Sequence, residues 1–273
     1  MNVLTAGSSN FLVNYIKNPK FHVHTKSTDP VHNMKKYALL FIFLGFQTAY
    51  SQKSATEIIN DFVNATGGSA SYDSLQNYTI RRTFRANAPT DFDEEVIVVP
   101  ATQSMSRRKT LMQRDFFYVV HLTNGWLRIP TGSRDKVATF SVKDLSEKES
   151  GAMRQEILDG LWPFLDATKK GYTLQLGSSP ATIRGQVCTP LILSQNGQSK
   201  QYFFGNQDGL LHREILEEEG QTVTWDHLEY RSTAKGFSYP VRSTVISTRD
   251  RRLTQVNTSV LVNTTIPAST FTR

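Results

Sequence analysis

The residues whose types could support chemistry stand at Trp225-Asp226-His227, with further histidines at His121 and His212. An aspartate beside a histidine could serve as an acid–base pair, and several histidines together could bind a metal ion. Metal ligands normally recur at short intervals such as His-x3-His, and these histidines do not. Neighbours in a strand also point to opposite faces. We therefore predict no catalytic residue and no metal site, and interpret these side chains as polar groups on strand surfaces.

Cys188 is the single cysteine, so it cannot form a disulfide within the chain. It stands beside Thr189-Pro190 in a predicted strand, with no histidine at motif spacing. A buried structural thiol is favoured over a nucleophile. The sequence also contains no Gly-x-Ser-x-Gly element, phosphate loop or dinucleotide fingerprint. We accordingly expect a protein that is not an enzyme and needs no cofactor.

A secretory signal peptide is predicted at residues 34–51. Lys35 and Lys36 form a basic start, the apolar run from Tyr37 to Phe46 follows, and Ala49-Tyr50-Ser51 is a small-x-small cleavage site. The apolar run is about ten residues, half of the roughly 20 needed to span a bilayer. We expect cleavage near Ser51 and a periplasmic or secreted protein. Because no cysteine stands at the cleavage point, a lipid anchor is not predicted.

Residues 1–33 have no evident role before such a signal. Our hypothesis is that translation begins at Met34 and that the first 33 residues are a gene-model error. A long signal-anchor leader is the alternative. Residues 52–273 contain no repeat, linker or low-complexity stretch, and we predict a single domain there.

The charge balance gives no reason to expect a nucleic-acid partner. Residues 1–51 hold five Lys and one Asp, so subtracting them from 31 basic and 24 acidic residues leaves 26 and 23, a net charge of +3. The arginines at Arg81-Arg82, Arg107-Arg108 and Arg249–Arg252 are dispersed and match no known motif. Solvated strand and hairpin charges explain them.

Two helices are predicted from capping boxes. Ser54-Ala-Thr-Glu57 precedes apolar residues at helical spacing, and Gly67-Gly68 is a helix-ending signal. Ser146-Glu-Lys-Glu149 begins a second helix, whose apolar spacing runs through Leu158 and Leu161 to Leu165. Pro163 would interrupt it, so we expect two short helical pieces that meet near 160–163 and cover a sheet face.

Short runs rich in aromatic and β-branched residues predict antiparallel strands on both sides of that second helix. Asn124-Gly125, Asn196-Gly197 and Arg249-Asp250 are read as turns, and Asn124-Gly125 as the strongest hairpin signal. The predicted strands are 78–85, 91–99, 105–109, 115–123, 172–176, 181–187, 189–194, 200–204, the meander within 201–247, 239–248 and 253–262. Six of their side chains are interpreted as one apolar face: Phe84, Val96, Val98, Phe117, Val119 and Trp126.

The order of these features resembles the LolA/LolB-like superfamily, in particular its divergent members called outer-membrane lipoprotein-sorting proteins. The resemblance rests on the helix ending in Gly67-Gly68, the helical insertion between strand sets, and the motifs at 225–231, 235–240 and 262–271. It covers nearly all of residues 52–273 but lies in turns and strand ends. It implies a mainly β (α+β) fold: a curved antiparallel sheet or incomplete β-barrel with an N-terminal helix and an inserted helical lid.

The same resemblance implies a carrier that holds a lipid-like molecule or a lipoprotein acyl chain in an apolar concavity, with an envelope membrane protein as a further partner. A non-catalytic interaction module with a filled concavity is the alternative, and an enzyme would need a polar cluster inside the concavity. Trp162 and Leu165 are our preferred lid residues. The full set of candidate ligand-binding residues is Phe84, Val98, Phe117, Val119, Trp126, Trp162, Leu165 and Trp225.

Overall fold

The computed structural model describes residues 53–273 except 90, 133–138, 219 and 234–235. The predicted leader and signal peptide, 1–33 and 34–51, lie outside the described residues. Residues Gln52–Arg273 form one compact unit. In the described part of the chain, no helix is both long enough and apolar enough to cross a membrane.

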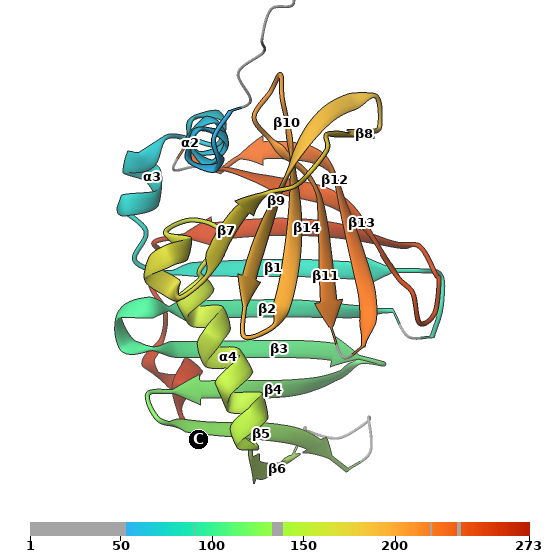
Figure 1. The fold of residues 1–273 in the computed structure, drawn as a ribbon. Coiled ribbons are helices and arrows are strands. Elements are labelled where there is room, and N and C mark those ends of the chain that lie inside the picture. The colour runs from blue at the N-terminus through green and yellow to red at the C-terminus, as the bar shows by residue number, and fades with distance from the viewer. Residues whose placement is uncertain (1–52, 90, 133–138, 219, 234–235) are drawn as a thin grey trace, which may run out of the picture. The chain divides into compact units, whose positions relative to one another are not determined.

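One antiparallel sheet of 14 strands makes up most of this unit (Figure 1). Its path runs β6-β5-β4-β3-β2-β1-β14-β13-β12-β11-β10-β9-β7, and β8 pairs with β9. The strands are β1 (Tyr78–Arg85), β2 (Phe92–Val99), β3 (Ser104–Leu111), β4 (Arg114–His121), β5 (Asn124–Thr131), β6 (Thr139–Asp144), β7 (Thr173–Leu176), β8 (Ala181–Ile183), β9 (Gln186–Gln195), β10 (Gln198–Gly205), β11 (Leu211–Glu218), β12 (Gln221–Ser232), β13 (Ser238–Ser247) and β14 (Thr254–Val262).

The sheet bends sharply where β13 meets β14. Only Arg242–Val245 of β13 pairs with β14, whereas β14 pairs with β1 along almost its whole length. In Figure 1, β9–β13 accordingly run across the direction of β1–β6. The curved antiparallel sheet predicted from the sequence is confirmed.

Both capping-box helices are present. Helix α2 (Ala55–Ala65) begins after Ser54, whose side chain and that of Glu57 cap each other's backbone N–H. Gly67 and Gly68 follow at φ of 125° and 79°, which a side chain would strain. A short helix, α3 (Ser69–Asp73), comes next. Helix α4 (Glu147–Asp159) connects β6 to β7 and crosses in front of β3 and β4.

The second helical piece was predicted wrongly. Helix α4 ends at Asp159, where Gly160 takes a φ of 68°, and after Pro163 the chain makes turns and a 3₁₀ helix, η2 (Ala167–Lys170). Leu158, counted in the apolar stripe, is 52% exposed. Pro163 has no N–H to donate to the Asp159 carbonyl, so α4 cannot continue through it.

Two turn assignments also differ. The run 181–187 is not one strand, because Arg184 and Gly185 form a tight turn between β8 and β9 with φ of 51° and 82°. The β4–β5 turn consists of Leu122 and Thr123, not Asn124-Gly125, and Asn124 pairs with His121 inside the ladder.

Gly125 is needed for a close approach. A Cβ atom there would lie 3.1 Å from the Cβ of Ser150 and 3.3 Å from the Cδ1 of Leu145. The Leu145 N–H also donates a 3.0 Å hydrogen bond to the Gly125 carbonyl. The glycine therefore lets the start of α4 rest directly on β5.

We expect Gly125→Val to lower the free energy of unfolding by about 1–3 kcal/mol, because the added methyl groups must push α4 off the sheet. Gly151→Ala is a matched control, since a Cβ on that α4 glycine meets nothing within 4 Å. Urea denaturation of both variants measures the difference. Equal stability of Gly125→Val and the wild type would contradict this role.

The predicted apolar face was wrong in its second half. The register places Val98, Met105, Val120 and Gly125 on one face, so Val119 and its partner Trp126 lie on the other. The C-terminal segment packs on that outer face, where Val119 and Trp126 are buried. Its 3₁₀ helix η3 (Ala268–Phe271) contacts β3 and β4.

Candidate functional site

One end of the inner face is a packed aromatic core. Phe62 of α2 meets Trp162 and Phe164 edge-on, with ring centroids 5.3 and 5.2 Å apart. Trp162 also stacks on Tyr239 of β13, and Phe164 lies against Phe204 of β10. All five side chains are buried. This end of the concavity is filled by the protein's own residues.

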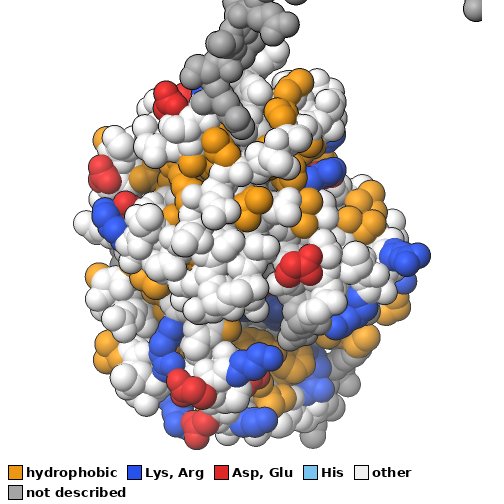
Figure 2. All heavy atoms as spheres, viewed as in Figure 1, with side chains coloured by type: hydrophobic (Ala, Val, Ile, Leu, Met, Phe, Trp, Pro, Cys, Tyr) orange, Lys and Arg blue, Asp and Glu red, His pale blue; other side chains and the backbone are white. Residues whose placement is uncertain are grey.

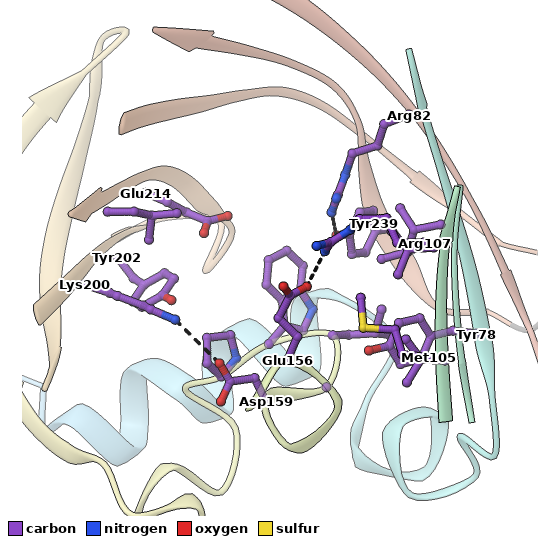
Figure 3. Close-up of a pocket in the computed structure, with 18 residues that line it drawn as sticks. Tyr78, Arg82, Met105, Arg107, Glu156, Asp159, Lys200, Tyr202, Glu214 and Tyr239 are labelled. Atoms are coloured by element: carbon purple, nitrogen blue, oxygen red, sulfur yellow. Dashed lines mark hydrogen bonds and ion pairs between the residues drawn. The ribbon is translucent and has the colours of Figure 1, made fainter. Parts of the chain in front are cut away.

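Beside this core, the sheet and the C-terminal end of α4 line a half-open pocket of about 190 Å³, here called the inner cavity (Figure 3). Its apolar wall includes Ile80, Val96, Val98, Met105 and Leu216. The adjoining cavity, of about 220 Å³, shares Arg82, Glu214, Leu216 and Tyr239 with the first and adds Trp225, His227 and Ser243.

Charged side chains line the remaining walls, which the sequence did not predict. Glu94 lies 3.2 Å from Arg82 and 3.2 Å from Arg107, and Arg107 also pairs with Glu156 of α4. Burial alone would raise the pKa of Glu94, but Arg107 and Arg82 outweigh it and hold that pKa below its usual range. The carboxylate is therefore ionised at neutral pH.

A second ion pair holds α4 to the other arm of the sheet. Lys200 of β10 lies 3.5 Å from Asp159, which also accepts a 2.9 Å hydrogen bond from the Tyr172 hydroxyl. Burial, together with that hydrogen bond, raises the pKa of Tyr172. Glu156 and Asp159 thus connect the end of α4 to both sides of the cavity, as the dashed lines in Figure 3 show.

The outer surface of this region carries charges of both signs. Figure 2 shows basic and acidic side chains interspersed in the lower part of this view, where Figure 1 places α4 and the strands behind it, with apolar side chains between them.

His227 is buried and faces the adjoining cavity, contrary to its interpretation as a strand-surface residue. Its Nδ1 is 2.9 Å from the Ser243 hydroxyl and its Nε2 is 2.8 Å from Glu214 Oε1. Asp226 points to the opposite face, as strand alternation predicted. There it pairs with Arg213. Alternation gives the face of His227, but its partners come from other strands and cannot be identified from local sequence.

Ser243, His227 and Glu214 are the residue types of a hydrolytic triad, but the geometry favours a structural role. Ser243 is only 2% exposed and sits in the middle of β13. A nucleophile must reach its substrate and needs N–H donors arranged for an oxyanion, whereas strand N–H groups are used in the ladder. The chain of hydrogen bonds instead holds the Glu214 carboxylate in place.

The other chemical candidates lie elsewhere. His121 is on the outer face, 2.7 Å from the Ser104 hydroxyl and stacked on Phe271. His212 bonds Asp208 at 3.0 Å, near the turn between β10 and β11. Cys188 is fully buried, and burial raises the pKa of its thiol to about 11. Among the described residues, no three His, Cys, Asp or Glu side chains are grouped to hold a metal ion.

The eight predicted ligand-binding residues are not brought together. Val98 and Trp162 line the inner cavity, and Trp225 lines the adjoining one. Phe84 lies beside Trp225, with ring centroids 6.0 Å apart, and Leu165 packs against the core. The remaining three are on the outer face: Phe117, Val119 and Trp126.

No family model matches the sequence, and a search of curated proteins finds no match. Several solved structures are similar. An outer membrane lipoprotein-sorting protein domain from Vibrio parahaemolyticus has 10% identity and a TM-score of 0.48 over 80% of this chain and 97% of that one.

Two further structures are similar over most of their own length. An uncharacterized conserved protein from Thermus thermophilus has 9% identity and a TM-score of 0.33, covering 81% of this chain and 94% of that one. The lipoprotein LppX from Mycobacterium tuberculosis has 9% identity and a TM-score of 0.30, covering 78% and 97%.

Proposed function

We propose that this protein is a non-catalytic carrier that binds one amphiphilic molecule, a lipid or the acyl end of a lipoprotein, in the inner cavity. The observation that carries the proposal is the division of the cavity walls. Ile80, Val96, Val98 and Met105 offer an apolar surface, Arg82 and Arg107 follow on two of the same strands, and the other charged lining residues come from α4, β10 and β11. Each buried CH₂ group contributes about 0.8 kcal/mol on such a surface.

The inner cavity by itself is small for a long chain, and in this proposal the end of α4 moves to admit one. A volume of about 190 Å³ is below the roughly 300–1,000 Å³ of typical ligand pockets. The helix is held by Arg107–Glu156 and Lys200–Asp159, and Glu156 is 45% exposed. A partly exposed ion pair such as Arg107–Glu156 contributes little to stability, so displacing α4 costs little at that contact, whereas Asp159 is buried and must also give up its hydrogen bond from Tyr172. The end of α4 serves as the lid in this proposal.

The proposal places the carrier outside the cytoplasm. Export follows from the signal peptide predicted at residues 34–51, and delivery would require an envelope membrane protein as acceptor. A second candidate is an envelope interaction module that carries no cargo. The packed aromatic end of the concavity, around Phe62 and Trp162, favours that alternative.

Native mass spectrometry of the protein purified from an envelope extract without detergent tests the proposal. A co-purifying lipid or acylated peptide is the expected result. A clean apo mass that stays unchanged after incubation with lipid would overturn the carrier and favour the interaction module.

We expect Leu216→Trp to reduce lipid binding at least ten-fold, because the indole would occupy the space shared by the two cavities. Ile246→Trp is the matched control, since Ile246 is 39% exposed and pairs with Thr224 on the outer face. Titration with a short-chain lipid, followed by calorimetry, measures both. Undiminished binding by Leu216→Trp would show that the ligand lies elsewhere.

A further inference from the structure

Glu214 differs from the other carboxylates around the two cavities in having no fixed cation as partner among the described residues. Glu94 forms ion pairs with Arg82 and Arg107, and Glu156 forms one with Arg107. Asp159 forms an ion pair with Lys200. The ionisable partner of Glu214 is His227, which is charged only when protonated. Glu94 lines neither cavity but pairs with Arg82 and Arg107, and with it counted these groups carry one more negative than positive fixed charge.

The second oxygen of Glu214 is available to a ligand. Its Oε1 is bound to His227 Nε2, and its Oε2 has no hydrogen-bond or ion-pair partner within the described part of the chain. The side chain is 17% exposed and lines both cavities. In Figure 3 its carboxylate points into the space that separates it from Arg82 and Arg107.

Aromatic groups share this space with Glu214. Trp225 and Tyr239 line the adjoining cavity, and aromatic faces attract cations. The guanidinium of Arg82 already lies 5.9 Å from the Trp225 ring centroid, but its charge is balanced by Glu94 at 3.2 Å. An anionic group entering here would meet the uncompensated Glu214 carboxylate.

We propose that Glu214 is the binding site for a protonated amino group of the ligand, so that the carrier selects amphiphiles with an ammonium headgroup. The hydrocarbon part lies along the apolar wall of the inner cavity, and the ammonium group donates hydrogen bonds to Glu214 Oε2. His227 and Ser243 are positioning residues that keep the carboxylate aimed into the cavity. This inference rests on the carrier function proposed above.

Calorimetric titration of the exported protein with octylamine, octanol and octanoate at pH 7 tests it. The three probes have the same chain length and differ in headgroup charge, since the amine is protonated and the acid ionised at this pH. A charge-assisted hydrogen bond should make octylamine bind about ten-fold more tightly than octanol, with octanoate weakest. Octylamine binding no more tightly than octanol, or octanoate binding most tightly, would overturn the ammonium site.

Glu214→Gln should abolish the preference of octylamine over octanol, because glutamine keeps the shape and can still bond His227 but lacks the charge that distinguishes the two headgroups. Glu217→Gln is the matched control, since Glu217 is exposed on the opposite face of the same strand. A preference that persists in Glu214→Gln would overturn the proposal. Should that variant fail to fold, the order of wild-type affinities still decides. Failure of all three probes to bind would overturn the carrier itself as well.

Discussion

Replacing Trp162 with alanine is expected to lower the free energy of unfolding by about 3–5 kcal/mol, the usual loss for a large aromatic core side chain. Trp162 is 3% exposed and packs against Phe62, Phe164 and Tyr239, so its removal leaves a cavity where α2, the segment after α4 and β13 meet. Guanidinium chloride unfolding, followed by circular dichroism, measures the loss.

Leu158→Ala provides the control for this prediction, because Leu158 is 52% exposed on the nearby helix. We expect a change of about 0.5 kcal/mol or less there. Similar stabilities for the two variants would mean that Trp162 lies at a mobile lid rather than in the core.

Glu94→Ala is the other change with a large expected effect, a loss of about 3 kcal/mol. Removing this carboxylate leaves the positive charges of Arg82 and Arg107 together without their shared partner, and breaking a buried pair is costly. The arginines are 24% and 20% exposed, so water moderates the cost and the lower end of the usual range applies. Asp93→Ala, which breaks an exposed pair with Arg85, should cost less than about 1 kcal/mol.

Acid titration tests the same ion pairs in a second way. The folded-state pKa of Glu94 is lowered, so its contribution to stability is present above the unfolded-state pKa, about 4.3, and is lost as pH falls through the folded-state value. The stability of Glu94→Gln should therefore fall less than that of the wild type as the pH drops from about 5. Parallel pH profiles for the two proteins would contradict the assignment.

Local signals were sufficient for much of the fold. The capping boxes at Ser54 and Ser146 predicted where α2 and α4 begin, because the bonds that stabilise these ends join residues three apart. Alternation predicted strands such as β1 at its observed bounds, and Asn196-Gly197 predicted its turn correctly. The turn at Leu122-Thr123 was predicted two residues too late, at Asn124-Gly125. The glycine at 125 is there because the start of α4 packs closely against it, and not because it forms a turn.

The site was only partly predictable. Trp225, Val98 and Trp162 could be named as aromatic or branched residues of an inner surface, and the structure places them in cavity walls. Trp126 was predicted to share a face with Val98, but the register places it on the outer face, where it is buried as well. Alternation specifies that two residues share a face, but it cannot specify which face of the sheet the rest of the chain leaves uncovered.

By itself, the sequence determined that this protein is built from antiparallel strands with a capped helix before them and another between two strand sets, since periodicity, caps and turns depend on neighbouring residues. Only the tertiary structure decided that the concavity is apolar at one end and charged at the other. Glu94 is paired by Arg82 and Arg107 from two adjacent strands, and Asp159 meets Lys200 across the cavity. Such charges can be buried only when the sheet's curvature brings their partners within a few ångströms, and that curvature depends on the whole sheet.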